Sequence, residues 1–171
     1  THNLPAIVIR PTNNFGPYQF PEKIIPLFIT NLLENRPVPL YGYGLNRRDW
    51  LFVLDNCRAI DLILHSGQIG QIYNVGAKDN EISNVELTCL IVERLKKPTH
   101  LIKFVKDRPG HDFRYALETK KIEELGFSPE YDLEKGLEET IRWYKKNEWW
   151  WRKLKDKEFE KYYQEQYQFK E

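Results

Sequence analysis

The stretch Ala6-Ile7-Val8-Ile9-Arg10, followed after Pro11 by Thr12-Asn13-Asn14-Phe15-Gly16-Pro17-Tyr18, decides the fold. A short continuous apolar run predicts a strand over residues 6–10 that is buried on both faces of a parallel sheet. The polar segment behind it contains Gly and Pro, and it lies where ligand-binding loops lie in open α/β sheets, just past the carboxyl end of a strand. We therefore expect an α/β protein with a binding loop around Asn13 and Asn14.

Strands and helices alternate along the rest of the chain. Apolar runs bounded by turn residues predict four further strands, over residues 38–41, 50–53, 72–75 and 101–105. Helical periodicity predicts helices over residues 21–36, 119–125 and 133–146. Pro26 marks either the true start of the first helix or a kink in it. This alternation favours an α/β fold.

Two further helices have recognisable starts. Asp55 has the position of an N-cap for a helix that continues to Leu64. Ser83 and Glu86 have the spacing of a capping box ahead of a helix that continues to Leu95.

The composition excludes several classes of protein. With 171 residues, 41% hydrophobic and 14% aromatic, the chain is long and apolar enough for a folded domain with a core. Lys+Arg 26 against Asp+Glu 25 leaves no excess charge for a phosphate polymer, so we expect no nucleic-acid partner. No apolar run has the length of a membrane span and no signal peptide is visible, so we expect no membrane partner and a cytoplasmic protein.

The cysteines and the N-terminus give two smaller expectations. Cys57 and Cys89 lie far apart in apolar stretches, which predicts two buried thiols rather than a disulfide or a metal site. The chain begins at Thr1, contains no methionine and enters a strand within six residues, so we interpret it as a piece of a longer polypeptide.

Three polar loops carry candidate binding residues, each with a structural alternative. Asn13 and Asn14 could read sugar hydroxyls or a carboxamide, or could satisfy turn backbone. In Arg47-Arg48-Asp49-Trp50 an arginine could bind a phosphate with the carboxylate holding it in position, or could form a surface salt bridge. In the loop over residues 107–111, Arg108 could bind a second phosphate oxygen, and His111 could donate to a ribose or phosphate or simply close the loop.

Other patterns are better explained without function. Tyr131 and Lys135 have the Y-x-x-x-K spacing of short-chain dehydrogenases but occur at the wrong end of the chain, in a turn-like stretch. Gly42-Tyr43-Gly44 lacks the third glycine and the strand-to-helix context of a dinucleotide fingerprint. The three consecutive tryptophans at 149–151 cannot share one helix face, which indicates a tail packed over the protein surface. We predict no metal site and no catalytic residue in this chain.

Together the three loops resemble a known family. Residues 13–23 (NNFGPYQFPEK), 38–42 (VPLYG) followed by 48–50 (RDW), 73–76 (YNVG) and 107–112 (DRPGHD) are similar, in order and spacing, to the dTDP-glucose 4,6-dehydratases of the extended short-chain dehydrogenase/reductase superfamily. The tail, with Trp143-Tyr144, the tryptophan run and Tyr162-Tyr163 through Tyr167, is similar too, so the resemblance covers essentially the whole chain.

The resemblance implies a fold and an activity. The chain would be the C-terminal, substrate-binding half of such an enzyme, with residues 1–20 and about 71–77 completing a Rossmann-type sheet beside a smaller α/β domain. The complete enzyme would use NAD to convert a dTDP-hexose to a 4-keto-6-deoxy sugar nucleotide. The N-terminal portion that binds most of the NAD and carries the catalytic residues would be absent from this chain, and the full-length protein would be a homodimer.

The resemblance also implies roles for individual residues. Asn14 is similar to an NAD-contacting residue and Asn13 to a substrate-binding one. Arg48 and Arg108 are similar to contacts with the pyrophosphate and nucleoside. The remaining residues that would surround the sugar nucleotide are Lys23, Ile24, Pro39, Leu40, Tyr41, Asn84, Asp107, Pro109, Gly110 and His111. Phe15 stands where the family usually has tyrosine.

Two other functions fit the same residues. One is another NAD-dependent nucleotide-sugar enzyme, an epimerase or a decarboxylase. The other is a nucleotide-sugar-binding module that works alone.

Overall fold

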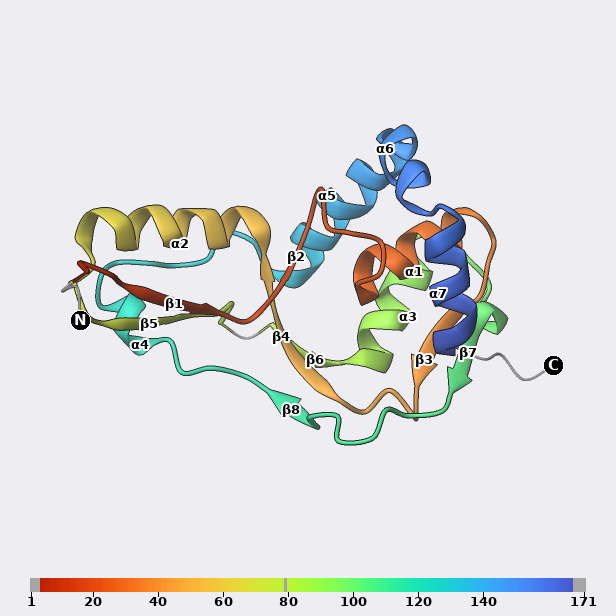
Figure 1. The fold of residues 1–171 in the computed structure, drawn as a ribbon, viewed down its shortest axis with the longest axis horizontal. Helices are drawn as coiled ribbons and strands as arrows, with labels where there is room; N and C mark the ends of the chain where they lie inside the picture. The colour runs from red at the N-terminus through yellow and green to blue at the C-terminus, as the bar shows by residue number, and fades with distance from the viewer. Residues whose placement is uncertain (1–3, 79, 168–171) are drawn as a thin grey trace.

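The computed structural model describes residues 4–78 and 80–167 as an elongated α/β molecule (Figure 1). Its N-terminal end is a small unit in which β1 (Val8–Pro11) pairs in parallel with β5 (Ile72–Val75). Helix α2 (Val53–Ser66) and the short α4 (Lys120–Glu123) lie beside this pair. Ala59 and Ile63 of α2 pack with Tyr73 and Val75 of β5 in an apolar cluster that ties the unit together.

The first strand differs from its prediction in burial. Val8 is 47% exposed and Ile72, its register partner, is 42% exposed. The residues of β1 alternate between exposed and intermediate burial, so the apolar run is not buried on both faces. The prediction of a doubly covered strand was therefore wrong for this chain.

A second sheet connects the two ends of the molecule. β2 (Asn13–Phe15) follows β1 after Thr12 and pairs in parallel with β4 (Arg47–Phe52). β4 also pairs with β6 (Glu81–Ser83) and β8 (Arg114–Tyr115). The strand predicted at 50–53 thus begins three residues earlier, because Arg47–Asp49 find their partners in segments more than thirty residues away. Arg48 consequently lies on a strand rather than in a loop.

The C-terminal end of the molecule holds the larger core. β3 (Val38–Tyr41) pairs in parallel with β7 (Ile102–Val105), which follows a 3-10 turn at Thr99–Leu101. Helices α1 (Ile24–Leu33) and α3 (Asn84–Arg94) pack beside this pair, with Ile25, Phe28 and Leu32 of α1 fully or almost fully buried.

The starts of α3 and α1 follow from local sequence signals, a capping box in α3 and a proline in the first turn of α1. The capping box is confirmed: Ser83 Oγ accepts from the Glu86 N–H, and the Glu86 carboxylate accepts from the Ser83 N–H. Helix α1 begins at Ile24, two residues before Pro26, so Pro26 occupies the first turn, where a missing N–H costs no intrahelical bond.

Asp55 does not cap α2, contrary to the prediction. The helix begins at Val53, and the buried carboxylate of Asp55 accepts hydrogen bonds from the backbone N–H groups of Glu130 and Tyr131, each at 3.1 Å. It also forms an ion pair with Arg58. A residue that resembles a local cap therefore fixes a distant turn instead.

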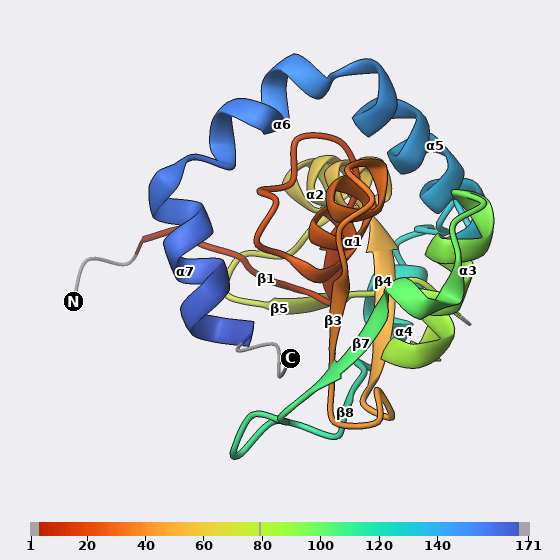
Figure 2. The same ribbon diagram turned by 90° about the vertical axis from the view of Figure 1, so that its right-hand side faces the viewer.

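The tail curves around the larger core as three helices (Figure 2). These are α5 (Leu133–Lys146), α6 (Glu148–Leu154) and α7 (Lys157–Tyr167). As expected, the three tryptophans do not share a face: Trp149 is exposed, whereas Trp151 is fully buried and its Nε1 donates to the Tyr144 carbonyl at 2.9 Å. The tail is thus part of the core as well as a cover for it.

Both cysteines are free but exposed, so the prediction of buried thiols was wrong. Cys57 lies on the outer face of α2 and Cys89 on the outer face of α3, on turns whose inner faces carry the buried residues. No described helix is long and apolar enough to cross a membrane. The described residues also contain no cluster of His, Cys, Asp and Glu that could hold a metal ion.

Candidate functional site

A cavity of about 300 Å³ lies between the larger core and the tail. This volume is in the range of pockets that hold small-molecule ligands. Residues of β2, β3 and β4, the N-terminal half of α1 and the C-terminal helix α7 all contribute to its wall. The lining residues are Asn13, Asn14, Gln19, Glu22, Lys23, Ile24, Leu27, Phe28, Pro39, Leu40, Tyr41, Arg48, Trp50, Asn84, Arg108, His111, Tyr162, Gln166 and Tyr167.

Arg48 is held in the cavity wall by main-chain carbonyls. Only 8% of the residue is exposed. Its Nη1 donates to its neighbour's carbonyl, that of Arg47, at 2.6 Å, and its Nη2 donates to the Asp112 carbonyl at 2.7 Å. The structure therefore rules out the surface salt bridge as its role. Asp49 does not hold it either, because Asp49 accepts from the Ala77 N–H on the opposite face of β4.

Arg108 and His111 meet Arg48 from the loop at 107–111. Nη2 of Arg108 lies 2.7 Å from His111 Nε2, and Nη2 of Arg48 lies 3.1 Å from the same nitrogen. Guanidinium groups only donate, so Nε2 must be the acceptor nitrogen of a neutral imidazole, with the proton on Nδ1. His111 Nδ1 is buried without a hydrogen-bond partner among the described residues. His111 Nδ1 lies 4.0 Å from Asp107 Oδ1. The two guanidinium groups thus meet at one imidazole in the cavity wall and present an anion with two cations.

The electrostatics of this group fit an anion. Burial, and then the charges of Arg108 and Arg48, lower the pKa of His111. Burial also lowers the pKa of Arg48, and the nearby Arg108 adds to that effect. Two guanidinium groups that share one imidazole repel each other, and a bound anion would relieve this repulsion.

The loop that carries Arg108 is braced by its neighbours. The Arg108 N–H donates to Asp107 Oδ1 at 2.8 Å, and the Arg108 guanidinium lies 4.8 Å from the centre of the Tyr41 ring. Gly42 has φ +54°, and a Cβ there would come within 2.9 Å of Asp107 Oδ2. Glycine is therefore favoured where the turn after β3 approaches this loop.

Unpaired polar atoms collect around the cavity. Among the described residues, buried side-chain atoms without a partner include Oδ1 of Asn13, Oδ1 of Asn14, Oε1 of Gln19, Nε1 of Trp50 and Nδ1 of His111. All five residues line the cavity. Because buried polar groups are almost always hydrogen-bonded in native proteins, this concentration indicates that a polar ligand completes the site.

Gln19 orients the first loop from within the cavity. Its Nε2 donates to the Asn14 main-chain carbonyl at 2.8 Å, and the main-chain carbonyl of Gln19 accepts from the Tyr144 hydroxyl of α5. Asn14 Nδ2 in turn donates to the Thr12 carbonyl at 3.0 Å. Each asparagine still has a free amide oxygen, so the turn-satisfying alternative does not account for all of their hydrogen-bonding capacity.

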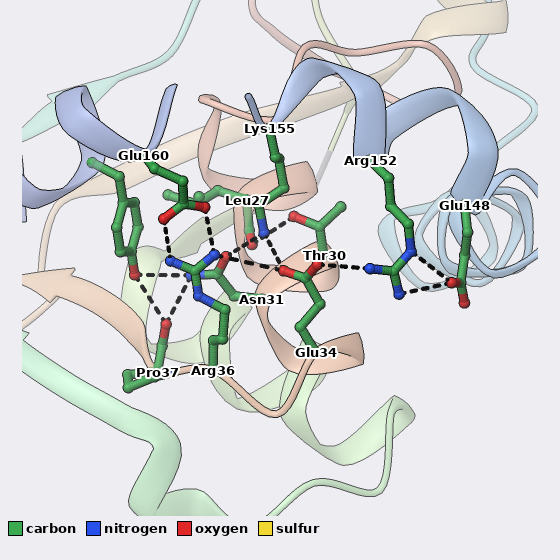
Figure 3. Close-up of polar contacts among 11 residues, drawn as sticks. Leu27, Thr30, Asn31, Glu34, Arg36, Pro37, Glu148, Arg152, Lys155 and Glu160 are labelled. Atoms are coloured by element: carbon green, nitrogen blue, oxygen red, sulfur yellow. Dashed lines mark hydrogen bonds and ion pairs between the residues drawn. The ribbon is translucent and has the colours of Figure 1, made fainter. Parts of the chain in front are cut away.

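The tail supplies one wall of the cavity and is fixed by a polar network (Figure 3). We call Asn31, Glu34, Arg36, Lys155 and Glu160 the tail network. Arg36 binds Glu160 through two hydrogen bonds of 2.6 and 2.7 Å. Lys155 donates to Glu34 at 2.6 Å and to Asn31 at 3.0 Å.

The tail network joins α7 to the helix that precedes β3. Asn31 Nδ2 donates both to the Pro37 carbonyl and to the Tyr163 hydroxyl, each at 2.8 Å. Burial lowers the pKa of Lys155, and the hydrogen bond from Arg36 lowers the pKa of Glu160. Because Tyr162, Gln166 and Tyr167 lie on the same helix, the tail network places them against the cavity.

Most of the residues predicted from sequence come together here. The cavity is lined by Asn13, Asn14, Lys23, Ile24, Pro39, Leu40, Tyr41, Arg48, Asn84, Arg108 and His111. Asp107 and Pro109 instead line an adjacent hollow beside β7, and Gly110 lines neither. The binding roles of these residues remain predictions.

Sequence reasoning missed the tail residues Tyr162, Gln166 and Tyr167, as well as Gln19 and Trp50. Gln19 stood inside the quoted loop, so its polar side chain was an available signal. The tail residues stood in a segment that resembles the family, but nothing in the sequence placed them against the first loop, more than 110 residues away.

Tyr131 and Lys135 do lie together, with the Lys135 ammonium 4.3 Å from the centre of the Tyr131 ring. They are not among the residues that line the cavity.

The comparisons with known proteins agree with this arrangement. The NAD dependent epimerase/dehydratase family matches residues 1–76. The dTDP-glucose 4,6-dehydratase of Streptomyces niveus is 51% identical over 156 residues, which cover 91% of this chain and 46% of that protein. The chain therefore spans about half the length of the curated relatives it matches.

Two crystal structures give the same result in three dimensions. The dTDP-glucose 4,6-dehydratase of Bacillus anthracis in complex with NAD superposes with a TM-score of 0.84 and 51% identity, covering 90% of this chain and 49% of that one. The enzyme of Streptomyces venezuelae, also with NAD bound, gives a TM-score of 0.87 and 46% identity, covering 90% and 48%.

The fold therefore matches that of the extended short-chain dehydrogenase/reductases, the class of the NAD-dependent epimerases and dehydratases. Within that class, the chain is a homologue of the dTDP-glucose 4,6-dehydratases over nine-tenths of its own length, which confirms the resemblance seen in the sequence.

Proposed function

We propose that this chain is the C-terminal, sugar-nucleotide-binding half of an NAD-dependent dTDP-glucose 4,6-dehydratase. The observation that carries the proposal is the convergence of Arg48, Arg108 and His111 on one cavity. Two guanidinium groups that share an imidazole match the charge of a diphosphate. The name of the relatives supplies the identity of the sugar nucleotide.

The cavity offers a different environment for each part of such a ligand. The two arginines offset the charge of the diphosphate. Pro39, Leu40 and Tyr41 provide the apolar and aromatic surface that a pyrimidine base requires. The free amide oxygen of Asn13 faces the remaining, hydroxyl-bearing part. Lys23, Ile24 and Asn84 complete the wall, and Asp107, Pro109 and Gly110 shape the loop that carries Arg108.

NAD is the cofactor that we propose for the complete enzyme. NAD accepts and returns a hydride when it is bound. Asn14 has a buried amide oxygen without a partner among the described residues, which fits an amide N–H donor such as the carboxamide of nicotinamide. Residues 1–20 and about 71–77 would complete the Rossmann-type sheet, and the exposed faces of Val8 and Ile72 leave room for the additional layer.

Calorimetric titration of the chain with dTDP tests the binding part of the proposal. We expect saturable binding of one dTDP per chain, weakened by raised salt as for any charge-assisted site. The control is thymidine, which lacks the diphosphate and should bind much more weakly. Absence of dTDP binding at millimolar concentration, with a normal melting curve, would refute the proposal.

A second measurement tests the assignment of the chemistry. A polypeptide that carries this chain together with the NAD-binding half should convert dTDP-glucose to a 4-keto-6-deoxy product, seen by mass spectrometry as the loss of one water. The 171-residue chain alone should give no product, because the catalytic residues of the relatives would lie in the other half. Product formed by the 171-residue chain would show that catalytic groups had been overlooked.

We also propose that the complete enzyme is a cytoplasmic homodimer. NAD and nucleotide sugars are charged molecules that do not cross membranes unaided, which supports the cytoplasm as its location. The homodimer follows from the family resemblance. Light scattering of the complete enzyme and fractionation of cells that express it are the respective tests.

A further inference from the structure

Trp50 belongs to the cavity through its position on β4. Side chains two residues apart on a strand project from the same face, so Trp50 projects from the same face of β4 as Arg48. Its register partner on the neighbouring parallel strand is Asn13. Trp50, Arg48 and Asn13 all line the cavity, so Trp50 lies beside the first loop and two positions from the diphosphate-binding arginine.

The indole N–H of Trp50 lacks a hydrogen bond among the described residues. Trp50 is only 3% exposed, and its Nε1 is buried without a partner. Its ring packs edge-on against Phe15, with centroids 6.3 Å apart and an interplanar angle of 87°. The other fully buried tryptophan, Trp151, donates to the Tyr144 carbonyl in the ordinary way. Since indole N–H groups usually find an acceptor when buried, the missing acceptor at Trp50 calls for an explanation.

Two free acceptors line the same cavity. Asn13 Oδ1 and Gln19 Oε1 are buried and unpaired in the described residues, as Trp50 Nε1 is. A ligand group that pairs with both the indole N–H of Trp50 and one of these amide oxygens must accept a hydrogen bond from the indole and donate one to the amide oxygen. An ionised phosphate only accepts, whereas a hydroxyl does both.

We propose that Trp50 is a specificity-determining residue that donates a hydrogen bond from Nε1 to a hydroxyl of the hexose in the bound sugar nucleotide. The proposal rests on the proposed sugar-nucleotide site and identifies the part of the ligand that Trp50 reads. The diphosphate is bound by Arg48 and Arg108, and the free indole donor serves the hydroxyl-bearing end, next to Asn13 and Gln19.

The test compares dTDP with dTDP-glucose by calorimetry on wild-type chain and Trp50→Phe. Phenylalanine keeps an aromatic ring but removes the N–H. We expect the dissociation constant for dTDP-glucose to rise roughly three- to tenfold, as one hydrogen bond contributes, while that for dTDP changes less than about twofold. If Trp50→Phe does not fold, replacement of Trp50 by 3-benzothienylalanine keeps the indole shape without the N–H and gives the same comparison.

Trp151→Phe is the matched control, because it removes a buried indole N–H that is bonded within the protein and does not line the cavity. It should lower the melting temperature without changing the ratio of the two affinities. An unchanged ratio in both variants at position 50, or an equal loss for dTDP and dTDP-glucose, would overturn the role of Trp50 and leave the proposed function intact. Failure of wild-type chain to bind dTDP would instead overturn the proposed function.

Discussion

Removal of the guanidinium at position 108 should weaken ligand binding and leave the fold almost unchanged. The Arg108 side chain lies 2.7 Å from His111 Nε2 and 4.8 Å from the centre of the Tyr41 ring, in an exposed loop. A charge-assisted hydrogen bond to a phosphate oxygen contributes about 1.5–3 kcal/mol. Arg108→Ala should therefore raise the dissociation constant for dTDP roughly 10- to 150-fold, because each 1.4 kcal/mol is about a factor of ten.

Arg48→Ala should produce a similar loss of affinity and an additional loss of stability. The Asp112 carbonyl would lose the donor that now lies 2.7 Å away, in a partly buried position. An unsatisfied buried acceptor costs about 1–3 kcal/mol of unfolding free energy. The melting temperature should fall by roughly 2–4 °C for each kcal/mol in a chain of this size. Lysine should rescue either position only in part, since it lacks the planar fork.

The assay is calorimetric titration with dTDP alongside thermal melting, with Arg142→Ala as the control. Arg142 is an exposed arginine that pairs with Glu139 on α5, away from the cavity, so its loss should change neither quantity by much. Unchanged dTDP affinity in both Arg48→Ala and Arg108→Ala, with folded protein, would refute the diphosphate site.

Three further predictions follow from the same contacts. The lowered pKa of His111 means that the folded chain opposes protonation of this imidazole, so the free energy of unfolding should decline as pH falls below about 6.5. A bound diphosphate favours the imidazolium, so dTDP-glucose affinity should rise over the same pH range. Calorimetry in buffers of different ionisation enthalpy should show proton uptake that His111→Asn abolishes, and binding without proton uptake in wild-type chain would contradict this. Arg36→Glu should speed hydrogen exchange in α7 and weaken dTDP binding a few-fold. The double variant with Glu160→Arg should restore both quantities. A double variant as impaired as the single one would show that the ion pair does not position α7. Tyr131→Phe should leave kcat of the complete enzyme nearly unchanged, whereas a loss of several orders of magnitude in a folded variant would make Tyr131 catalytic after all.

Local sequence determined those elements whose signals involve near neighbours. The capping box of Ser83 and Glu86 depends on atoms three residues apart, and the structure contains it. The strands at 38–41 and 72–75 and the helix at 133–146 match their predicted bounds, because periodicity reports which face of an element is apolar. Eleven of the binding residues that the family resemblance predicted line one cavity in the structure.

Tertiary structure alone decided how those residues are used. Sequence placed Arg48 after a glycine turn, but only the pairing of β4 with two distant strands buries it and brings the Asp112 carbonyl to its guanidinium. The same limit applies to the tail, which forms a cavity wall through contacts between α1 and α7. Periodicity encodes the direction in which a side chain points. Periodicity does not predict which residue a hundred positions away will contact that side chain, because the packing of the whole chain selects that partner.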